Sequence, residues 1–447
     1  MLDLPKEFSA RMKSMLGGEF DEFVKSFDKE KFQALRINSL KTDGEVVKKE
    51  FSLRPVPWCG QGYYFSAEER PGKSVLHEGG AYYIQEPSAM SVAENLDVQE
   101  GEIILDLCAA PGGKSTQIAN LLNGRGLLVS NEIIPSRAKI LSQNIERLGI
   151  KNCIVTNESP KSLADRFVGI FDKILVDAPC SGEGMFRKNQ LAIDEWSEDN
   201  VKLCKARQLD ILDEAVKMLS SSGRIVYSTC TFSKEENEEV VDEFLSKYPD
   251  FEVLPSKYQF CKGYPLDGGK HNDMLALTNR IFPHKFDGEG HFFAILQRSG
   301  NRDAVKYSLQ SPKISQSQVK IFNEWQKENL STSFVADLAF GDNLYAMPKG
   351  TPRLDRLKVE RAGLHLGIVV KNRFEPSHSL ALALKPSEAK RVINLSQEDA
   401  TKYIGGQTLP CEGEKGWALA VYEGITLGWC KCDGAYAKNH YPKGLRR

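Results

Sequence analysis

Two cysteines in this 447-residue chain each follow an apolar run typical of a buried strand. Cys180 ends "KILVDAPC", Cys230 ends "RIVYSTC", and Asp177 stands three positions before Cys180. An acid beside a thiol suits covalent attack on a ring carbon, with the thiolate as nucleophile. Attack needs only one thiol, so the spacing leaves open which cysteine attacks and what the other does. Two inert, buried cysteines are the alternative.

A glycine-rich loop, "ILDLCAAPGGKS", puts Asp106 at an expected strand end, ahead of an expected helix. Small residues let a ligand approach the backbone, and helix N–H groups can face a carboxylate or phosphate. A P-loop would need glycine where Cys108 stands, and the dinucleotide fingerprint is absent. S-adenosylmethionine is the third candidate, with Glu132 about 20 residues past the loop to hold ribose hydroxyls. A purely structural tight turn also stays open.

From about Glu102 short apolar strands alternate with helical segments, which predicts an α/β fold with a doubly wound parallel sheet. We expect a last strand over 291–298, and the spacing of Ser233 and Glu236 predicts a capping box that opens a helix over 234–248. Carboxyl ends of parallel strands share one rim, so the loop and both cysteines should meet there. The other expected strands span 102–108, 125–133, 152–158, 171–180 and 224–230, and the expected helices span 112–124, 136–150 and 204–223.

Composition divides the chain into four parts. We expect an N-terminal module over 1–80, the α/β core over 81–300, a polar linker over 301–320 and a β-rich C-terminal region over 321–447. Residues 331–447 carry 17 Lys and Arg against 12 Asp and Glu. A basic end is compatible with nucleic-acid binding and equally with a solvated tail.

The composition and the first residues argue against two classes of protein, membrane-spanning and secreted. Charged residues make up 27% and no apolar run approaches the roughly 18 residues of a membrane span, so a membrane protein is not expected. The first residues lack a secretory signal pattern, which predicts a cytoplasmic protein. Ten scattered cysteines do not form a disulfide framework, and the spacing of Cys430 and Cys432 is not that of a zinc knuckle, so no metal is expected.

The residues around Cys180 favour methylation of a ring carbon over methylation of an exocyclic amine. Enzymes that methylate exocyclic amines usually carry an aromatic side chain after the proline of this motif, whereas "DAPC" carries a thiol. C5 of cytosine is a poor nucleophile until a thiolate adds at C6 and a donor supports N3. Covalent activation of a pyrimidine ring is therefore the favoured chemistry.

The motifs together resemble the Nop2/Sun family of RNA cytosine-C5 methyltransferases, over nearly the whole chain. The matching stretches are "DLCAAPGGKS", "SNEIIPSRAKIL", "DAPCSGEGMFRK", "YSTCTFSKEENE" and "GEGHFFAIL", and the stretches "RFEPSHSLALAL" and "GWALAVYEGITLGWCKCDGAYAKNHYPKGLR" resemble its bacterial ribosomal-RNA branch of RsmF type. The resemblance implies a Rossmann-like methyltransferase core with an N-terminal RNA-binding module and a C-terminal PUA-like module. It also implies S-adenosylmethionine as cofactor and RNA as partner, most of all 16S rRNA or the small ribosomal subunit, with no DNA, no membrane and a monomeric protein.

The resemblance assigns roles that spacing leaves open. It implies that Cys230 is the nucleophile and that Cys180 assists release of the methylated product. Asp177 would support the cytosine ring, and Lys114 with Asp177 would border both cofactor and base. The implied cofactor contacts are Cys108, Ala109, Ala110, Pro111, Gly112, Gly113, Lys114, Glu132, Arg137 and Asp177.

Two parts of the resemblance leave alternatives. The family usually has an acid after the third strand near the adenine, where this chain reads "TNESP", so Glu158 or Ser159 is expected to take that role. In the C-terminal module Lys431, Lys438, Lys443, Arg446 and Arg447 are candidates for phosphate contacts. The same chemistry on tRNA, and an RNA-binding assembly factor without catalysis, are the alternative functions.

Overall fold

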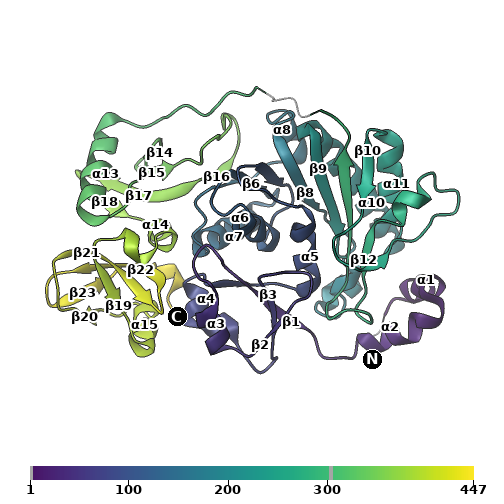
Figure 1. The fold of residues 1–447 in the computed structure, drawn as a ribbon, viewed down its shortest axis with the longest axis horizontal. Coiled ribbons are helices and arrows are strands. Elements are labelled where there is room, and N and C mark those ends of the chain that lie inside the picture. Colours follow the sequence, from purple (N-terminus) through teal and green to yellow (C-terminus); the bar gives the residue numbers. More distant parts are fainter. Residues whose placement is uncertain (1–3, 302–305) are drawn as a thin grey trace.

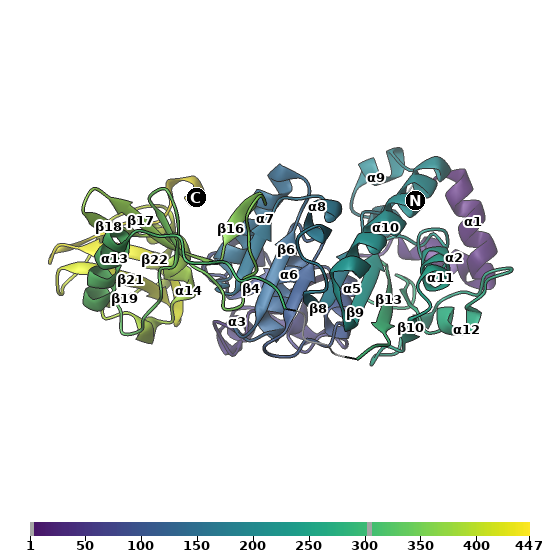
Figure 2. The ribbon, with the colours of Figure 1, turned by 90° about the horizontal axis from the view of Figure 1, so that it is seen from above.

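The computed structural model describes residues 4–301 and 306–447. Three parts follow one another along the long axis of the molecule (Figure 2): a pair of N-terminal helices, a central α/β core, and a C-terminal β-rich part. The core lies between the other two parts (Figure 1).

The central sheet confirms the expected doubly wound arrangement. Five parallel strands lie in the order β9-β8-β5-β6-β7. Their bounds are Ile103–Asp106 (β5), Leu127–Asn131 (β6), Cys153–Thr156 (β7), Phe171–Asp177 (β8) and Leu219–Thr229 (β9). Antiparallel strands continue the sheet beyond β9: the expected β13 (His291–Arg298), then β12 (Asn279–Ile281) and β11 (Cys261–Lys262), with β10 (Phe251–Leu254) also pairing with β13.

Helices cover both faces of this sheet, as its nearly continuous apolar strands require. Buried side chains of α5 (Pro87–Asn95), α6 (Gly113–Leu121) and α7 (Pro135–Arg147) form the core on one face. The other face is covered by α8 (Pro160–Ala164), α10 (Glu198–Met218) and α11 (Glu238–Lys247). The short helices α9 (Gln190–Asp194) and α12 (Asn272–Leu275) lie at the periphery of the core (Figure 2).

Several expected helix bounds differ from those observed. The helix expected over 204–223 is α10, which begins earlier, at Glu198, and ends at Met218, because the next residues join β9. The expected capping box does not form, and α11 begins at Glu238. Ser233 Oγ does accept the N–H of Glu236 at 3.2 Å, but the Glu236 carboxylate turns away to accept hydrogen bonds from Ser181.

The N-terminal residues contact the core in two places. Helices α1 (Lys6–Leu16) and α2 (Phe20–Ser26) pack their aromatic residues against Phe186, Trp196 and Phe232. The four-stranded sheet β2-β3-β1-β4 follows, and its strand β1 contacts α5. Its strands are Gln33–Ile37 (β1), Leu53–Pro55 (β2), Gly62–Phe65 (β3) and Tyr82–Ile84 (β4), with helices α3 (Glu45–Glu50) and α4 (Val75–Glu78).

The C-terminal part contains two small sheets, in agreement with the expected β-rich region. The first, β14-β15-β17-β18, packs against α13 and α14, and the second has the order β19-β21-β22-β23-β20. The expected linker over 301–320 includes residues 302–305, which lie outside the described residues, and α13 begins within it at Gln316. The elements are α13 (Gln316–Asn329), β14 (Leu338–Phe340), β15 (Asn343–Ala346), β17 (Leu364–Val370), β18 (Arg373–Pro376), α14 (His378–Ala383), β19 (Val392–Asn394), α15 (Gln397–Ile404), β20 (Leu409–Pro410), β21 (Gly416–Tyr422), β22 (Ile425–Cys432) and β23 (Tyr436–Asn439).

One strand of the C-terminal part joins the core. β16 (Val359–Ala362) leaves its neighbours β15 and β17 and pairs antiparallel with β7, at the free edge of the central sheet. This pairing covers an edge that would otherwise expose unpaired backbone groups. It also brings the C-terminal part against the strand that precedes Glu158. Among the helices of residues 4–301 and 306–447, none is both long and apolar enough to cross a bilayer.

Candidate active site

The two cysteines lie side by side at the carboxyl rim of the parallel sheet. Cys180 follows β8 and Cys230 follows β9, and these strands are neighbours with Asp177 in register with Ser228. The two Sγ atoms are 3.2 Å apart, a hydrogen-bonding distance between sulfur atoms. The structure therefore brings both predicted thiols and the predicted acid to one place.

Asp177 is the centre of a charged cluster. Its carboxylate accepts a hydrogen bond from Lys114 Nζ at 2.7 Å and one from Ser228 Oγ at 2.7 Å, and His291 Nε2 lies 3.6 Å from the same Oδ1 atom that Ser228 contacts. Burial alone would raise the pKa of Asp177, but Lys114 and His291 hold it well below its ordinary value. In turn Asp177 offsets burial and raises the pKa of Lys114. The pair is therefore an ionised carboxylate and a charged ammonium.

The environment of Cys180 keeps its proton. The hydrogen bond with Cys230 and burial raise the pKa of Cys180 well above its usual value. Cys108, in the glycine-rich loop, also has a raised pKa because it is buried. A thiol with a raised pKa is a poor nucleophile, so neither cysteine is favoured for the attack.

The loop ahead of α6 has the shape expected for a cofactor cradle. Gly112 takes φ +112°, a left-handed conformation that favours glycine, and Gly113 begins the helix. Ala109 and Ala110 are buried residues of the loop itself, and Pro111 follows them in chain order. Arg137 Nη2 donates to the carbonyl of Ala110 at 2.8 Å, which ties α7 to this loop.

The residues present fit S-adenosylmethionine. Glu132 is 3% exposed and follows β6, and it accepts the N–H of Ile134 through Oε1 at 2.9 Å. A carboxylate can accept about four hydrogen bonds, so capacity remains for two ribose hydroxyls. Arg137 Nη1 is 3.5 Å from Glu132 Oε2 and balances its charge. Glu132 would hold the ribose, and the loop from Cys108 to Lys114 would face the methionine part.

Asp106 is fully buried under this loop, and burial raises its pKa to about 7. Its Oδ2 accepts from Ser115 Oγ at 2.6 Å, and Ser130 Oγ donates to the same hydroxyl at 2.9 Å. Its Oδ1 has no hydrogen-bond partner. A buried acceptor oxygen without a hydrogen-bond partner therefore lies near the start of α6.

The two candidates for the adenine side already have partners. Glu158 Oε1 accepts the backbone N–H of Lys358, just before β16, at 2.7 Å. Ser159 Oγ accepts the N–H of Ser162 at 3.1 Å and caps α8. The neighbouring Asn157 also donates its backbone N–H to the carbonyl of Lys358. The C-terminal part therefore contacts the loop after β7, where the adenine-side candidates lie.

The basic residues at the C-terminus fall into two groups. Arg447 forms an ion pair with Glu78, and Arg446 donates to the carbonyl of Tyr441. Lys431 and Lys438 are exposed on neighbouring strands, directly opposite each other in register, and Lys443 is exposed near the end of the chain. Lys431 Nζ also lies over the Trp417 ring, 5.4 Å from its centroid. The three lysines are exposed to solvent, whereas the two arginines have hydrogen-bond or ion-pair partners within the protein.

Sequence reasoning missed three residues that shape this site. Ser228 lies within "YSTC", but a serine beside a motif cysteine gives no separate signal. His291 starts an antiparallel strand, so it reaches the rim from the opposite chain direction. Arg36, 1% exposed, comes from β1 and donates to the carbonyl of Gly113 and to Thr116 Oγ1 at 3.2 and 2.7 Å. Only the fold brings the distant residues His291 and Arg36 to the site.

Residues 93–297 match the family described as 16S rRNA methyltransferase RsmB/F. Further segments match the N-terminal domain (4–87), the first C-terminal domain (325–384) and the PUA domain (390–447) of RsmF methyltransferases. The ribosomal RNA small subunit methyltransferase F of Vibrio vulnificus is 32% identical over 99% of this chain and 98% of its own. The chain belongs to the RsmF family of 16S rRNA methyltransferases.

Other relatives agree with this membership. The corresponding protein of Shewanella piezotolerans is 31% identical over 95% of this chain and 93% of its own. A methyltransferase homolog of known structure from Pyrococcus horikoshii superposes with a TM-score of 0.59 at 29% identity, covering 66% of this chain and 96% of that one. This RsmF-family enzyme is thus a ribosomal RNA methyltransferase with S-adenosylmethionine as methyl donor, as the resemblance of its sequence motifs predicts.

Proposed function

We propose that this enzyme methylates C5 of cytosine in 16S rRNA through a covalent bond between Cys230 Sγ and C6 of the base. The observation that carries the proposal is the pair of thiols 3.2 Å apart beside the ionised Asp177. Cys180 keeps its proton, so Cys230 is the better candidate for the thiolate.

Each residue at the carboxyl rim of the sheet then has its own part in the reaction. The Cys230 thiolate adds to C6, and the electron pair of the C5–C6 double bond moves into the ring, toward N3. Asp177 can accept a hydrogen bond from the exocyclic amine, while the Lys114 ammonium can donate to the ring edge. When bound, S-adenosylmethionine supplies the methyl group.

Release needs a second group on the same ring. After C5 has gained its methyl group it still carries a proton, and removal of that proton lets the C6–sulfur bond break. The electron pair of the C5–H bond then reforms the double bond, and Cys230 leaves as thiolate. Cys180 can place a water molecule that takes the C5 proton, or it can give its own proton to such a water molecule and then take the C5 proton as a thiolate. Attack and release thus use two thiols on one rim.

The experiment uses denaturing gels after incubation with 16S rRNA and S-adenosylmethionine. Cys230→Ala should be inactive and migrate as free protein, because no adduct forms. Cys180→Ala should methylate once and stall as a slow protein–RNA band. Cys261→Ala, which changes a half-buried cysteine on β11, is the matched control and should behave as wild type. A band with Cys230→Ala and none with Cys180→Ala would assign attack to Cys180 and contradict the proposal.

We propose a monomer that acts on rRNA or the small ribosomal subunit in the cytoplasm and not on DNA, with the residues before the core and the PUA domain gripping RNA. Bisulfite sequencing of RNA from cells with and without the gene separates the alternatives. Loss of 5-methylcytosine from 16S rRNA supports the proposal, loss from tRNA favours the tRNA alternative, and no loss favours an assembly factor.

A further inference from the structure

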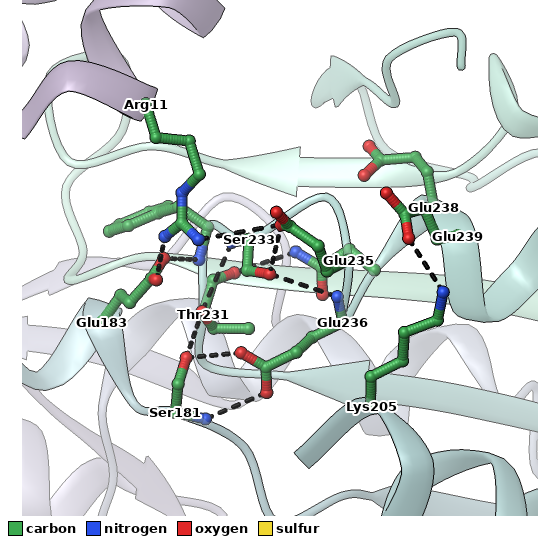
Figure 3. A network of polar contacts seen from close by, with 12 residues as sticks. Arg11, Ser181, Glu183, Lys205, Thr231, Ser233, Glu235, Glu236, Glu238 and Glu239 are labelled. Carbon is green, nitrogen blue, oxygen red and sulfur yellow. Dashed lines mark hydrogen bonds and ion pairs between the residues drawn. The ribbon is translucent and has the colours of Figure 1, made fainter. Parts of the chain in front are cut away.

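Two adjacent buried residues, Glu236 and Asn237, lie between β9 and α11 and are both 0% exposed. Their side chains point in different directions, Glu236 toward the loop after β8 (Figure 3) and Asn237 toward the loop after β9. Each side chain forms hydrogen bonds to residues next to one of the two thiols. These hydrogen bonds are called tethers below.

The tethers on the Cys180 loop involve Glu236 and Gln208. Glu236 accepts the backbone N–H of Ser181 at 2.9 Å and also the Ser181 hydroxyl. Gln208 Nε2 donates to the carbonyl of Pro179 at 3.0 Å and to Glu236 at 2.9 Å. The residues before and after Cys180 are therefore both fixed, one through α10 and one through Glu236.

On the Cys230 loop, Asn237 forms hydrogen bonds to both residues that flank the cysteine. Thr229 Oγ1 donates to Asn237 Oδ1 at 2.6 Å, and Asn237 Nδ2 donates to the carbonyl of Thr231 at 3.0 Å. The N–H of Gly184 adds a hydrogen bond to the carbonyl of Cys230 itself at 2.8 Å. The residues before and after Cys230 are thus held by one side chain.

The two sets of tethers start from adjacent residues but hold different loops. Because Glu236 and Asn237 are consecutive, they fix the two loops relative to one another, and a hydrogen bond of 2.9 Å between Ser181 Oγ and Thr231 Oγ1 joins the loops directly. A carboxylate that accepts three hydrogen bonds in a buried site strongly favours one arrangement of its donors. Burial raises the pKa of Glu236 to about 7, in keeping with its enclosure.

We propose that Glu236 and Asn237 are positioning residues with separate tasks: Asn237 places Cys230 for attack, and Glu236 places Cys180 for release. The inference rests on the proposed covalent mechanism. It predicts that changes to adjacent residues stop the reaction at different points. A displacement of a reacting group by about 1 Å can cost about 100-fold in rate, so each effect should be large.

The first set of variants addresses the Cys180 loop. Glu236→Ala and Gln208→Ala each remove one tether, and both should lower turnover by about 100-fold while a protein–RNA band accumulates on denaturing gels. Glu236→Gln should restore release, because its amide oxygen can accept from Ser181 N–H while its nitrogen donates to the Ser181 hydroxyl. The double change Cys180→Ala with Glu236→Ala should stall no more than Cys180→Ala alone, since both act through one group.

The second set addresses the Cys230 loop. Asn237→Asp keeps the size of the side chain but sets an oxygen against the carbonyl of Thr231, and Thr229→Val removes the other hydrogen bond without changing shape. Both should lower the yield of adduct by about 100-fold at early times, with no band accumulating. Melting curves and S-adenosylmethionine binding of each variant identify any that fail to fold.

Cys230→Ala and Cys180→Ala are analysed on the same denaturing gels as reference variants. If the references behave as proposed but Glu236→Ala forms no band, or Asn237→Asp accumulates one, the division of tasks is wrong. Stalling of Glu236→Gln as severe as that of Glu236→Ala would show that the charge acts directly and would overturn the positioning role. If the references themselves reverse or both form no band, the covalent mechanism has failed, which is a different result. A band with the Glu236 and Gln208 changes and its absence with the Asn237 and Thr229 changes is the supporting outcome.

Discussion

The carboxyl rim of the central sheet and the outer face of the PUA domain differ in how they hold their functional groups. At the rim, Asp177 has three polar neighbours, and the carboxylate of Glu236 accepts three hydrogen bonds in a buried network. On the PUA domain, Lys431 and Lys438 are exposed and opposite each other across two strands. Bond-making needs reacting groups fixed to within a fraction of an ångström, whereas phosphate contacts tolerate mobile cations.

The two regions are joined by the β16–β7 pairing and by Arg361. The guanidinium of Arg361 is 4% exposed and donates to Ser379 Oγ at 2.8 Å and to Glu146 Oε2 at 3.1 Å. Glu146 belongs to α7 of the core, and Ser379 belongs to α14 of the C-terminal part. The C-terminal part is thus anchored on α7 and on the edge strand β7 of the core.

The largest effect is expected at the rim itself. Asp177→Asn removes the negative charge that Lys114 faces and the strongest acceptor for the base, so turnover should fall by about 100-fold. Single-turnover methylation of 16S rRNA measures this. Asp165→Asn, at an exposed acid on the core, is the matched control. Unchanged turnover in Asp177→Asn would show that the ring is supported by other groups.

A smaller effect is expected at the cofactor side. Glu132→Ala should weaken S-adenosylmethionine binding by about 10- to 100-fold, the range for hydrogen bonds to a charged group. Calorimetry without RNA tests this, and Glu100→Ala, an acid paired with Arg125 on the surface, serves as control. Equal affinities of the variant and wild type would place the ribose elsewhere. A loss with Glu158→Ala would instead support its role at the adenine side.

The joint between the core and the C-terminal part, formed by Arg361, should affect the free energy of unfolding more than the rate of methylation. Arg361→Met removes hydrogen bonds to Ser379 and Glu146, and Glu146 is partly exposed, so the free energy of unfolding should fall by about 2 kcal/mol. Thermal or urea denaturation measures the change. Arg353→Met, at an exposed ion pair with Asp355, should change stability by less than about 1 kcal/mol. Equal losses in the two variants would mean that burial of Arg361 contributes nothing to the joint.

The smallest effect is expected on the PUA face. The double change Lys431→Ala with Lys438→Ala should weaken RNA binding several-fold and lower the slope of log affinity against log salt by about 2, or about 1 per lost contact. S-adenosylmethionine affinity should not change. Lys161→Ala with Lys217→Ala alters net charge equally at exposed sites on the core and is the control. An unchanged salt slope would exclude these lysines as phosphate contacts.

Local sequence determined the strands that carry the site and the order in which they come. An apolar run followed by an acid and a cysteine predicts a strand end with chemistry on it, because strand formation and turn formation depend on near neighbours. The rule that parallel strands share a carboxyl rim then placed Asp177, Cys180 and Cys230 together, and the structure has them there. The same reasoning found the strand over 291–298, with bounds that match β13.

Tertiary structure alone decided which distant side chains hold those groups. Glu236 has the spacing of a helix cap, and locally that interpretation is sound, but three donors from other segments offered it stronger hydrogen bonds. His291 reaches Asp177 only because β13 runs antiparallel to β9, and β16 reaches β7 only because the core leaves an edge open. Such contacts depend on long-range packing, which a pattern of neighbouring residues does not contain.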